Sequence, residues 1–327
     1  MKRFSKGSVL ILLPLIFGLW LWFSAESRPQ NQPASQPNSS VSGQLSPQPS
    51  NAPAPTTGDA AAQPTQQTIT AEQLLTELEK QAKDKNPNAM IILGSLYERG
   101  LNNSPKRNFG KALDWYQQAA NLDLPEGIYN VGVCYEIGMG VAPDMTKAMD
   151  NFQKAAGKGL PQAELKLASL YLNGDGVKAD VTKGMDYLQK AADKNFPQAI
   201  MELGIVYYYG TFDKKRDLTQ AKDLFQKAAN LGQPAAMQNL AVMSVAGEGM
   251  VANKTQGLKW YLLSQQFGFN SPDMQTTIDG IKAEMAAAEV SKAEAEAKQW
   301  ADDFRAKVEA NQAAARAAAE AAKATSE

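Results

Sequence analysis

The sequence predicts an all-α protein: an α/α solenoid of about five helix-turn-helix repeats, flanked by an N-terminal transmembrane helix and long C-terminal helices. Two observations lead to the repeats. A Leu or Val followed by Gly or Ala recurs along the chain, in four copies with Tyr three residues further on. Alanine pairs recur at a period of about three dozen residues, which is typical of stacked repeats. The pairs are Ala119-Ala120, Ala155-Ala156, Ala191-Ala192 and Ala228-Ala229.

Composition excludes several classes of chemistry. The 327 residues include no histidine, so the sequence offers no Ser-His-Asp or Cys-His catalysis and no histidine metal site. The single cysteine, Cys134, cannot form an intrachain disulfide. It falls in a helical pattern and is interpreted as a small buried residue, with a reactive thiol or an intermolecular bridge as alternatives. A net charge of −1 gives no reason to expect nucleic acid as a partner.

Residues 1–26 predict a signal anchor. Three basic residues precede an uncharged run from Gly7 to Ala25, which as a helix spans roughly 28 Å, close to the thickness of a bilayer core. We expect residues 8–25 to contact the lipid bilayer as a single pass of an inner (cytoplasmic) membrane, with the N-terminus in the cytoplasm. A cleaved signal peptide is the alternative, but Phe23 or Trp22 would stand where cleavage needs a small residue.

Residues 27–69 predict a disordered linker that tethers the folded part to the membrane. They are rich in Pro, Gln and Ser, and only Arg28 and Asp59 are charged. With eight prolines and almost no large apolar side chain, burial cannot offset the entropy of ordering. A proline-motif ligand is the alternative interpretation.

Residues 70–271 predict the repeat solenoid. A helix with the capping-box form Thr70-Ala71-Glu72-Gln73 is expected to close its N-terminal end, with Leu74, Leu75 and Leu78 on one apolar face. Five repeats follow, starting near Ala89, Gly127, Ala163, Ala199 and Ala236.

The two helices of each repeat carry different patterns. In the first, the small residue, the Leu or Val and the Tyr lie on one face, and the Gly or Ala after the Leu or Val allows a neighbouring helix to approach. Gly-rich loops such as Gly174-Asp175-Gly176-Val177 end this helix. An Asp or Asn N-cap is expected to open the second helix, because its side chain can accept from first-turn amides. These caps are Asn108, Asp144, Asp180, Asp217 and Asn253.

One consensus describes the copies: Ala…Leu-Gly-x-x-Tyr-x-x-Gly-x-Gly-Val-x-x-Asp-x-x-Lys-Ala…Ala-Ala. It resembles the Sel1-like repeat, a relative of the tetratricopeptide repeat, as found in a membrane-anchored bacterial member. The second and third copies match almost completely, whereas the fifth has Ser244 at the Tyr position and Ser264-Gln265 at the alanine pair. The resemblance implies a right-handed α-solenoid that binds other proteins, without a particular partner or chemistry.

Residues 272–305 predict C-terminal capping helices. Ser271-Pro272-Asp273 is expected to open the first, and Ser291-Lys292-Ala293-Glu294 has the form of a capping box for the second. Residues 306–327 are Ala-rich with little to bury, so a frayed helix or a disordered tail is expected. A coiled-coil surface for another chain is the alternative, although no sustained apolar heptad supports it.

We predict no catalytic, cofactor-binding or metal-binding residue. Asp175 and Glu248 stand between glycines, but the oxygen ligands that a calcium loop needs at alternate positions are absent from the sequence there. Turn geometry explains both residues, and no small-molecule substrate is evident.

A candidate partner-binding surface lies on the first helix of each repeat. In each first helix, take the Gly or Ala that follows the Leu or Val. The residues three before and four after it are unusually apolar for an exposed stripe. With an adjacent tyrosine, these stripe residues are Ile91, Glu98, Tyr129, Glu136, Leu165, Leu172, Met201, Tyr208 and Tyr209. The alternative, left open residue by residue, is that they pack against the next repeat.

The sequence therefore predicts a non-enzymatic scaffold or adaptor, exported to the periplasm, that holds a protein partner in the concave face of the solenoid. A regulator or subunit of an envelope complex is the first interpretation. An inhibitor or immunity protein that neutralises a periplasm-delivered toxin is an alternative, as is a secreted or surface host-interaction factor. An Asp/Glu-dependent enzyme is the alternative of another class.

Overall fold

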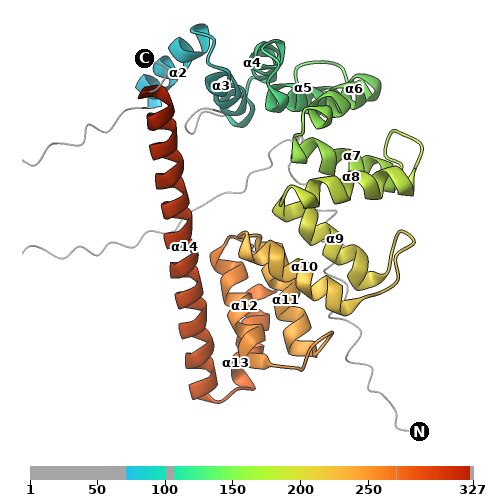
Figure 1. Cartoon of the computed structure of the whole chain (residues 1–327), viewed down its shortest axis with the longest axis vertical. Helices are drawn as coiled ribbons and strands as arrows, with labels where there is room; N and C mark the ends of the chain where they lie inside the picture. The colour runs from blue at the N-terminus through green and yellow to red at the C-terminus, as the bar shows by residue number, and fades with distance from the viewer. Residues whose placement is uncertain (1–70, 101–106, 270, 325–327) are drawn as a thin grey trace, which may run out of the picture. The chain divides into compact units, whose positions relative to one another are not determined.

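The computed structural model describes residues 71–100, 107–269 and 271–324, and this part of the chain consists of helices joined by turns, without strands (Figure 1). The predicted anchor (1–26), linker (27–69) and cap at Thr70 lie outside the described residues. Contacts group the described chain from Leu75 onward into one unit. The helices are α2 (Ala71–Lys83), α3 (Pro87–Arg99), α4 (Phe109–Asn121), α5 (Pro125–Ile137), α6 (Met145–Gly157), α7 (Pro161–Asn173), α8 (Val181–Asp193), α9 (Pro197–Tyr209), α10 (Leu218–Asn230), α11 (Pro234–Ala246), α12 (Lys254–Gln266), α13 (Met274–Ala283) and α14 (Ala287–Ala324).

Ten of these helices, α3 to α12, form the five predicted repeats. Each repeat is a pair of helices, α3 with α4 through α11 with α12, and the second helix of one pair packs on the first helix of the next. Every helix in the ten is 13 residues long. The all-α solenoid prediction is confirmed, because each amphipathic pair buries its apolar face on both neighbours.

The first helix of every repeat begins with proline, a regularity that the sequence analysis did not use. Proline lacks an amide hydrogen, so it costs nothing at a position where the helix has no partner for that donor, and its fixed φ suits the first turn. The five residues are Pro87, Pro125, Pro161, Pro197 and Pro234.

The predicted caps of the second helices are confirmed. Each Asp or Asn side chain accepts from the amide three residues on, at 2.9–3.0 Å. The amide of the same residue donates to the carbonyl at the tyrosine position of the preceding helix, at 2.7–2.8 Å, for example Asp144 to Tyr135. One residue thus starts the second helix and ties it to the first. Gly138, at the end of α5, has φ of 79°, which glycine adopts without strain.

Each pair of helices uses one glycine at its closest approach. In the first, second and fourth repeats the glycine is in the first helix, and a β-carbon there would lie 2.3–2.7 Å from a buried ring: Gly94 on Tyr116, Gly132 on Phe152, Gly204 on Phe225. In the third and fifth repeats the glycine is in the second helix, where Gly184 faces Leu172 and Gly257 faces Val245. The absent side chain lets the opposite one fill the space, as dense core packing requires.

The core contains the alanine pairs and Cys134. The first alanine of each of the four pairs is fully buried, and so is Cys134, which supports its interpretation as a small core residue. Burial raises the pKa of the Cys134 thiol to about 12, which disfavours a reactive thiolate. In the fifth repeat Ser264 takes the alanine position and is fully buried, and its hydroxyl donates to the Pro234 carbonyl at 2.9 Å.

Both ends of the repeat array differ in detail from the prediction. In α2, Leu78 is buried and Leu75 packs beside it, but Leu74 is 51% exposed, so the predicted apolar face is wrong for that residue. At the other end, α13 begins at Met274 rather than Ser271, and the Asp273 side chain makes no capping bond. The Met274 amide instead bonds to the Ser271 carbonyl, so Ser271-Pro272-Asp273 forms a turn.

The last helix, α14, also corrects the sequence analysis. It begins at Ala287, so the predicted capping box at Ser291 lies inside it; Glu289 accepts from the Ala286 amide instead. It continues to Ala324 without a boundary near residue 306 (Figure 1). Its first half packs on α12 through a cluster of rings with centroids 5.2–5.9 Å apart: Trp260, Phe267, Trp300 and Phe304.

Candidate functional site

Three of the predicted stripe residues belong to the hydrophobic core. Leu165, Met201 and Tyr208 are 5%, 4% and 5% exposed and lie in one buried cluster. The first helices are apolar on several sides, and packing of the neighbouring repeat covers these side chains. For these three residues the inter-repeat alternative is therefore the correct one.

The other six stripe residues are half-buried and mostly engaged with neighbours. Ile91 packs against two core clusters, Leu172 fills the space beside Gly184, and the Tyr129 ring lies 5.5 Å from that of Phe152. Tyr209 lies edge-on to the Tyr208 ring at 4.8 Å, and its hydroxyl is buried without a hydrogen bond.

The two acidic stripe residues make polar contacts between helices. Glu98 accepts a hydrogen bond from the Tyr116 hydroxyl at 2.7 Å, and Glu136 pairs with Lys166 of the next repeat at 2.7 Å. Burial, with the Glu136 carboxylate, raises the pKa of Tyr129 to about 12. The stripe thus connects helices and repeats, and partner binding through it stays a prediction.

A second repeated surface is open to solvent, and we call its units rungs. In each rung, a lysine near the start of the repeat's second helix lies over a half-buried tyrosine ring. This tyrosine lies near the C-terminal end of the repeat's first helix. The lysine ammonium is 5.0–5.5 Å from the ring centroid, within the range of a cation–π interaction. Rung 1 is Tyr97 with Lys111, rung 2 is Tyr135 with Lys147, and rung 3 is Tyr171 with Lys183.

In rungs 2 and 3 the lysine charge is matched by the helix cap. Lys147 lies 3.3 Å from Asp144, and Lys183 lies 3.3 Å from Asp180. The amide of the same lysine, followed by its ammonium group, holds the pKa of each aspartate below its ordinary value. Both rungs are therefore locally neutral.

Rung 1 lacks this neutralising carboxylate. Its cap is Asn108, which makes the same bond to the Lys111 amide at 2.9 Å but carries no charge. Within the described ranges, neither Lys111 nor Lys83 of α2 forms an ion pair, although several other lysines do. Both lysines are exposed. Lys111 of rung 1 and the neighbouring Lys83 are thus two cations that no aspartate or glutamate of the described chain offsets by contact.

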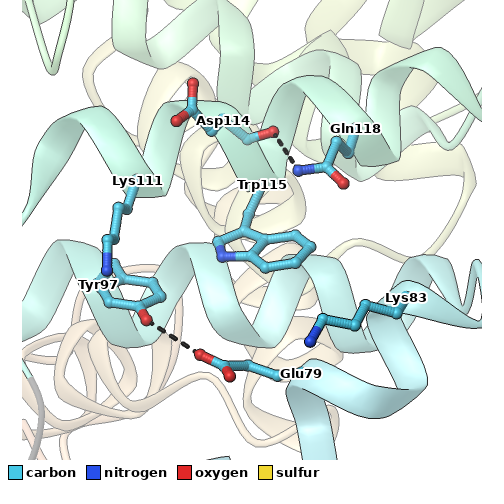
Figure 2. A pocket seen from close by; sticks show the side chains of 7 residues that line it. All are labelled: Glu79, Lys83, Tyr97, Lys111, Asp114, Trp115 and Gln118. Atoms are coloured by element: carbon cyan, nitrogen blue, oxygen red, sulfur yellow. Dashed lines mark hydrogen bonds between the residues drawn. The ribbon is translucent and has the colours of Figure 1, made fainter.

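A shallow pocket of about 320 Å³ lies at rung 1, between α2, α3 and α4. Figure 2 shows the half-buried Trp115 indole at its centre, with Tyr97 and Lys111 on one side and Lys83 on the other. Glu79 of α2 accepts a hydrogen bond from the Tyr97 hydroxyl at 3.3 Å, and the Asp114 carboxylate points away from the indole. Its lining is Glu79, Lys83, Tyr97, Lys111, Asp114, Trp115 and Gln118.

The sequence analysis missed this pocket, though part of its pattern was visible. The consensus contains both the tyrosine and the lysine three residues after the cap, but nothing in the sequence shows that the two side chains meet. The exchange of aspartate for Asn108 was the available sign, because it changes the charge while keeping the cap.

Two other features bear on what the described chain can do. Among residues 71–100, 107–269 and 271–324, no group of three or more Cys, Asp or Glu side chains is placed to hold a metal ion. In the same ranges no helix is both long and apolar enough to cross a bilayer. The predicted anchor lies outside them.

A model of the Sel1 repeat matches the chain five times in succession. The matches cover more than half of the chain: residues 87–124, 125–160, 161–196, 197–233 and 234–264. Each match begins at the first residue of a repeat's first helix, namely α3, α5, α7, α9 and α11. The chain belongs to the Sel1 repeat family. Sel1 repeat proteins are protein-interaction scaffolds, so the family agrees with a binding role rather than a catalytic one.

Solved structures and one curated protein resemble this Sel1 repeat chain. A Sel1 repeat protein from Oxalobacter formigenes is 28% identical, with a TM-score of 0.59 over 72% of this chain and 94% of that one. A protective antigen of uropathogenic Escherichia coli strains is 24% identical, with a TM-score of 0.50 over 70% and 56% of the two chains, which shows the fold alone. A component of an ERAD-associated E3 ubiquitin ligase of Arabidopsis thaliana, HRD3B, is 45% identical over 53 residues, 16% of this chain and 9% of that protein.

Proposed function

We propose that this Sel1 repeat chain is a non-catalytic scaffold that holds a partner protein along the surface formed by its rungs. The observation that supports this most directly is the repetition of the same pair, an exposed lysine over a half-buried tyrosine, in three successive repeats, with the pocket at Trp115 beside the first of them. Tyrosine and tryptophan are enriched among the residues that dominate protein interfaces. Three of the stripe residues are buried in the core and so offer a partner no comparable surface.

Photo-crosslinking from single positions tests this proposal in the cells that make the protein. A crosslinking amino acid is placed at Gln118 in the pocket, at Asn151 near rung 2 and at Ala310 on α14; the first and last are exposed and Asn151 is half-buried. We expect one and the same protein to be captured from Gln118 and Asn151 and not from Ala310, and an excess of unmodified chain to compete for it. Equal capture from all three positions, or none from the rungs, would refute the proposal.

We also propose that residues 1–26 anchor the scaffold in an inner membrane and that 27–69 hold the repeats on its outer side, as part of an envelope complex. The uncharged run from Gly7 to Ala25 behind three basic residues supports this. Protease added to spheroplasts should release the repeats by cutting within 27–69. Protection of the repeats until the cells are lysed would contradict this orientation and leave the binding proposal standing.

A further inference from the structure

We propose that rung 1 and its pocket bind an acidic segment of the partner protein, with an apolar side chain of that segment against the Trp115 indole. This inference rests on the proposed scaffold function and specifies its ligand. It commits to a peptide segment rich in Asp and Glu around one large apolar residue.

The first step is the charge around the pocket. The amines of Lys83 and Lys111 stand on opposite sides of the indole and form no ion pair within the described chain (Figure 2). The pocket lining holds these two lysines and two carboxylates, Glu79 and Asp114, so its distinctive feature is the unpaired state of the amines rather than an excess of positive charge. An acidic segment is complementary to two amines that have no ion-pair partner.

The second step is that the carboxylates of the pocket itself do not occupy the two amines. Glu79 faces the Tyr97 hydroxyl, which donates a hydrogen bond to it, and Asp114 points away from the indole. Neither lies within ion-pair distance of Lys83 or Lys111. Carboxylates of a bound segment can therefore approach both amines without displacing an existing pair.

The third step is the apolar centre. Trp115 packs on one side against the cluster of Leu78, Met90 and Leu93, and its remaining surface forms part of the pocket lining. A partly exposed indole gains by covering its face with an apolar side chain, and it holds one orientation because its other side is packed. The volume of about 320 Å³ suits one large side chain and its flanking backbone.

Selection from a display library of random 12-residue peptides on the full-length chain tests the inference. We expect the selected peptides to carry several Asp or Glu residues around a Leu, Phe or Trp, and to bind more weakly as salt is raised. The double variant Lys83→Glu, Lys111→Glu should lose roughly four- to 25-fold in affinity for them, because each exposed charge contributes a factor of about two to five.

The matched control is Lys147→Glu, Lys183→Glu, which reverses the lysines of rungs 2 and 3 and should leave the affinity within about twofold. Because all four lysines are exposed, neither variant disturbs the core. Neutral or basic selected peptides, or an equal loss in both variants, would overturn the inference. A partner crosslinked from Gln118 that the rung 1 variant still captures would overturn it too, while leaving the scaffold function intact.

Discussion

The repeats that carry rung 1 and rung 2 are packed in the same way in the core but differ in the charge on their surface. In both repeats a glycine in the first helix lies on a buried ring of the second, Gly94 on Tyr116 and Gly132 on Phe152. The cap and the tyrosine–lysine contact recur as well. The charge of the cap differs, since Asn108 stands where Asp144 does in the next copy. The repeat thus keeps what the fold requires, and the surface charge differs at a position where the fold accepts either residue.

The largest effect, on the free energy of unfolding, is expected from substitutions at the glycine–ring contacts that both repeats have. Gly94→Ala and Gly132→Ala should each lower the free energy of unfolding by about 1–3 kcal/mol, because the new methyl group would overlap a buried ring. Urea denaturation followed by circular dichroism measures this. The control is Gly157→Ala in α6, where a β-carbon meets nothing within 4 Å, and which should be neutral or slightly stabilising. A loss in only one of the two repeats would show that their cores are not equivalent.

A smaller effect is expected from making rung 1 resemble rung 2. Asn108→Asp keeps the helix cap and places a carboxylate beside Lys111, so it should lower the affinity for the selected acidic peptides by roughly two- to fivefold with little change in stability. Fluorescence anisotropy with a labelled peptide measures it. Asp144→Asn, the reverse exchange in rung 2, should leave that affinity unchanged. If Asn108→Asp has no effect either, cap charge does not distinguish the rungs.

The fold was predictable because its determinants are local. A cap such as Asp180, a turn such as Gly174 and a small residue such as Ala163 each act within a few residues of their place in the sequence, and the period repeats them in five copies. For the C-terminal tail the sequence predicted a frayed helix or a disordered tail, and the structure has an exposed helix there. Alanine favours helix, and a helix already anchored on α12 extends without a new nucleation step, so α14 continues to Ala324.

The candidate site could be predicted only in part, because it depends on how neighbouring helices pack. The first helices are apolar nearly all round, as in α9, so periodicity does not tell which side the next repeat covers. Met201 and Tyr208 are buried for that reason. The pocket forms only if Glu79 and Lys83 of α2 lie beside Tyr97 and Trp115. The turn between α2 and α3, in which Lys85 has a φ of 62°, determines how α2 is placed on the next two helices.

The smallest effect is expected in an acid titration, in which the lysine amides of rungs 2 and 3 should respond to pH and that of rung 1 should not. The pKa values of Asp144 and Asp180 are lowered, so the stability that these carboxylates give to their caps is present above the ordinary aspartate pKa of 3.8 and is lost as the pH falls through their lower folded values. Asn108 does not titrate. In nuclear magnetic resonance spectra, the amide signals of Lys147 and Lys183 should therefore move below pH 3.8, while that of Lys111 stays in place. A Lys111 amide that moves with the same midpoint would mean that a carboxylate pairs with Lys111, whose amine would then not be free to bind an acidic ligand.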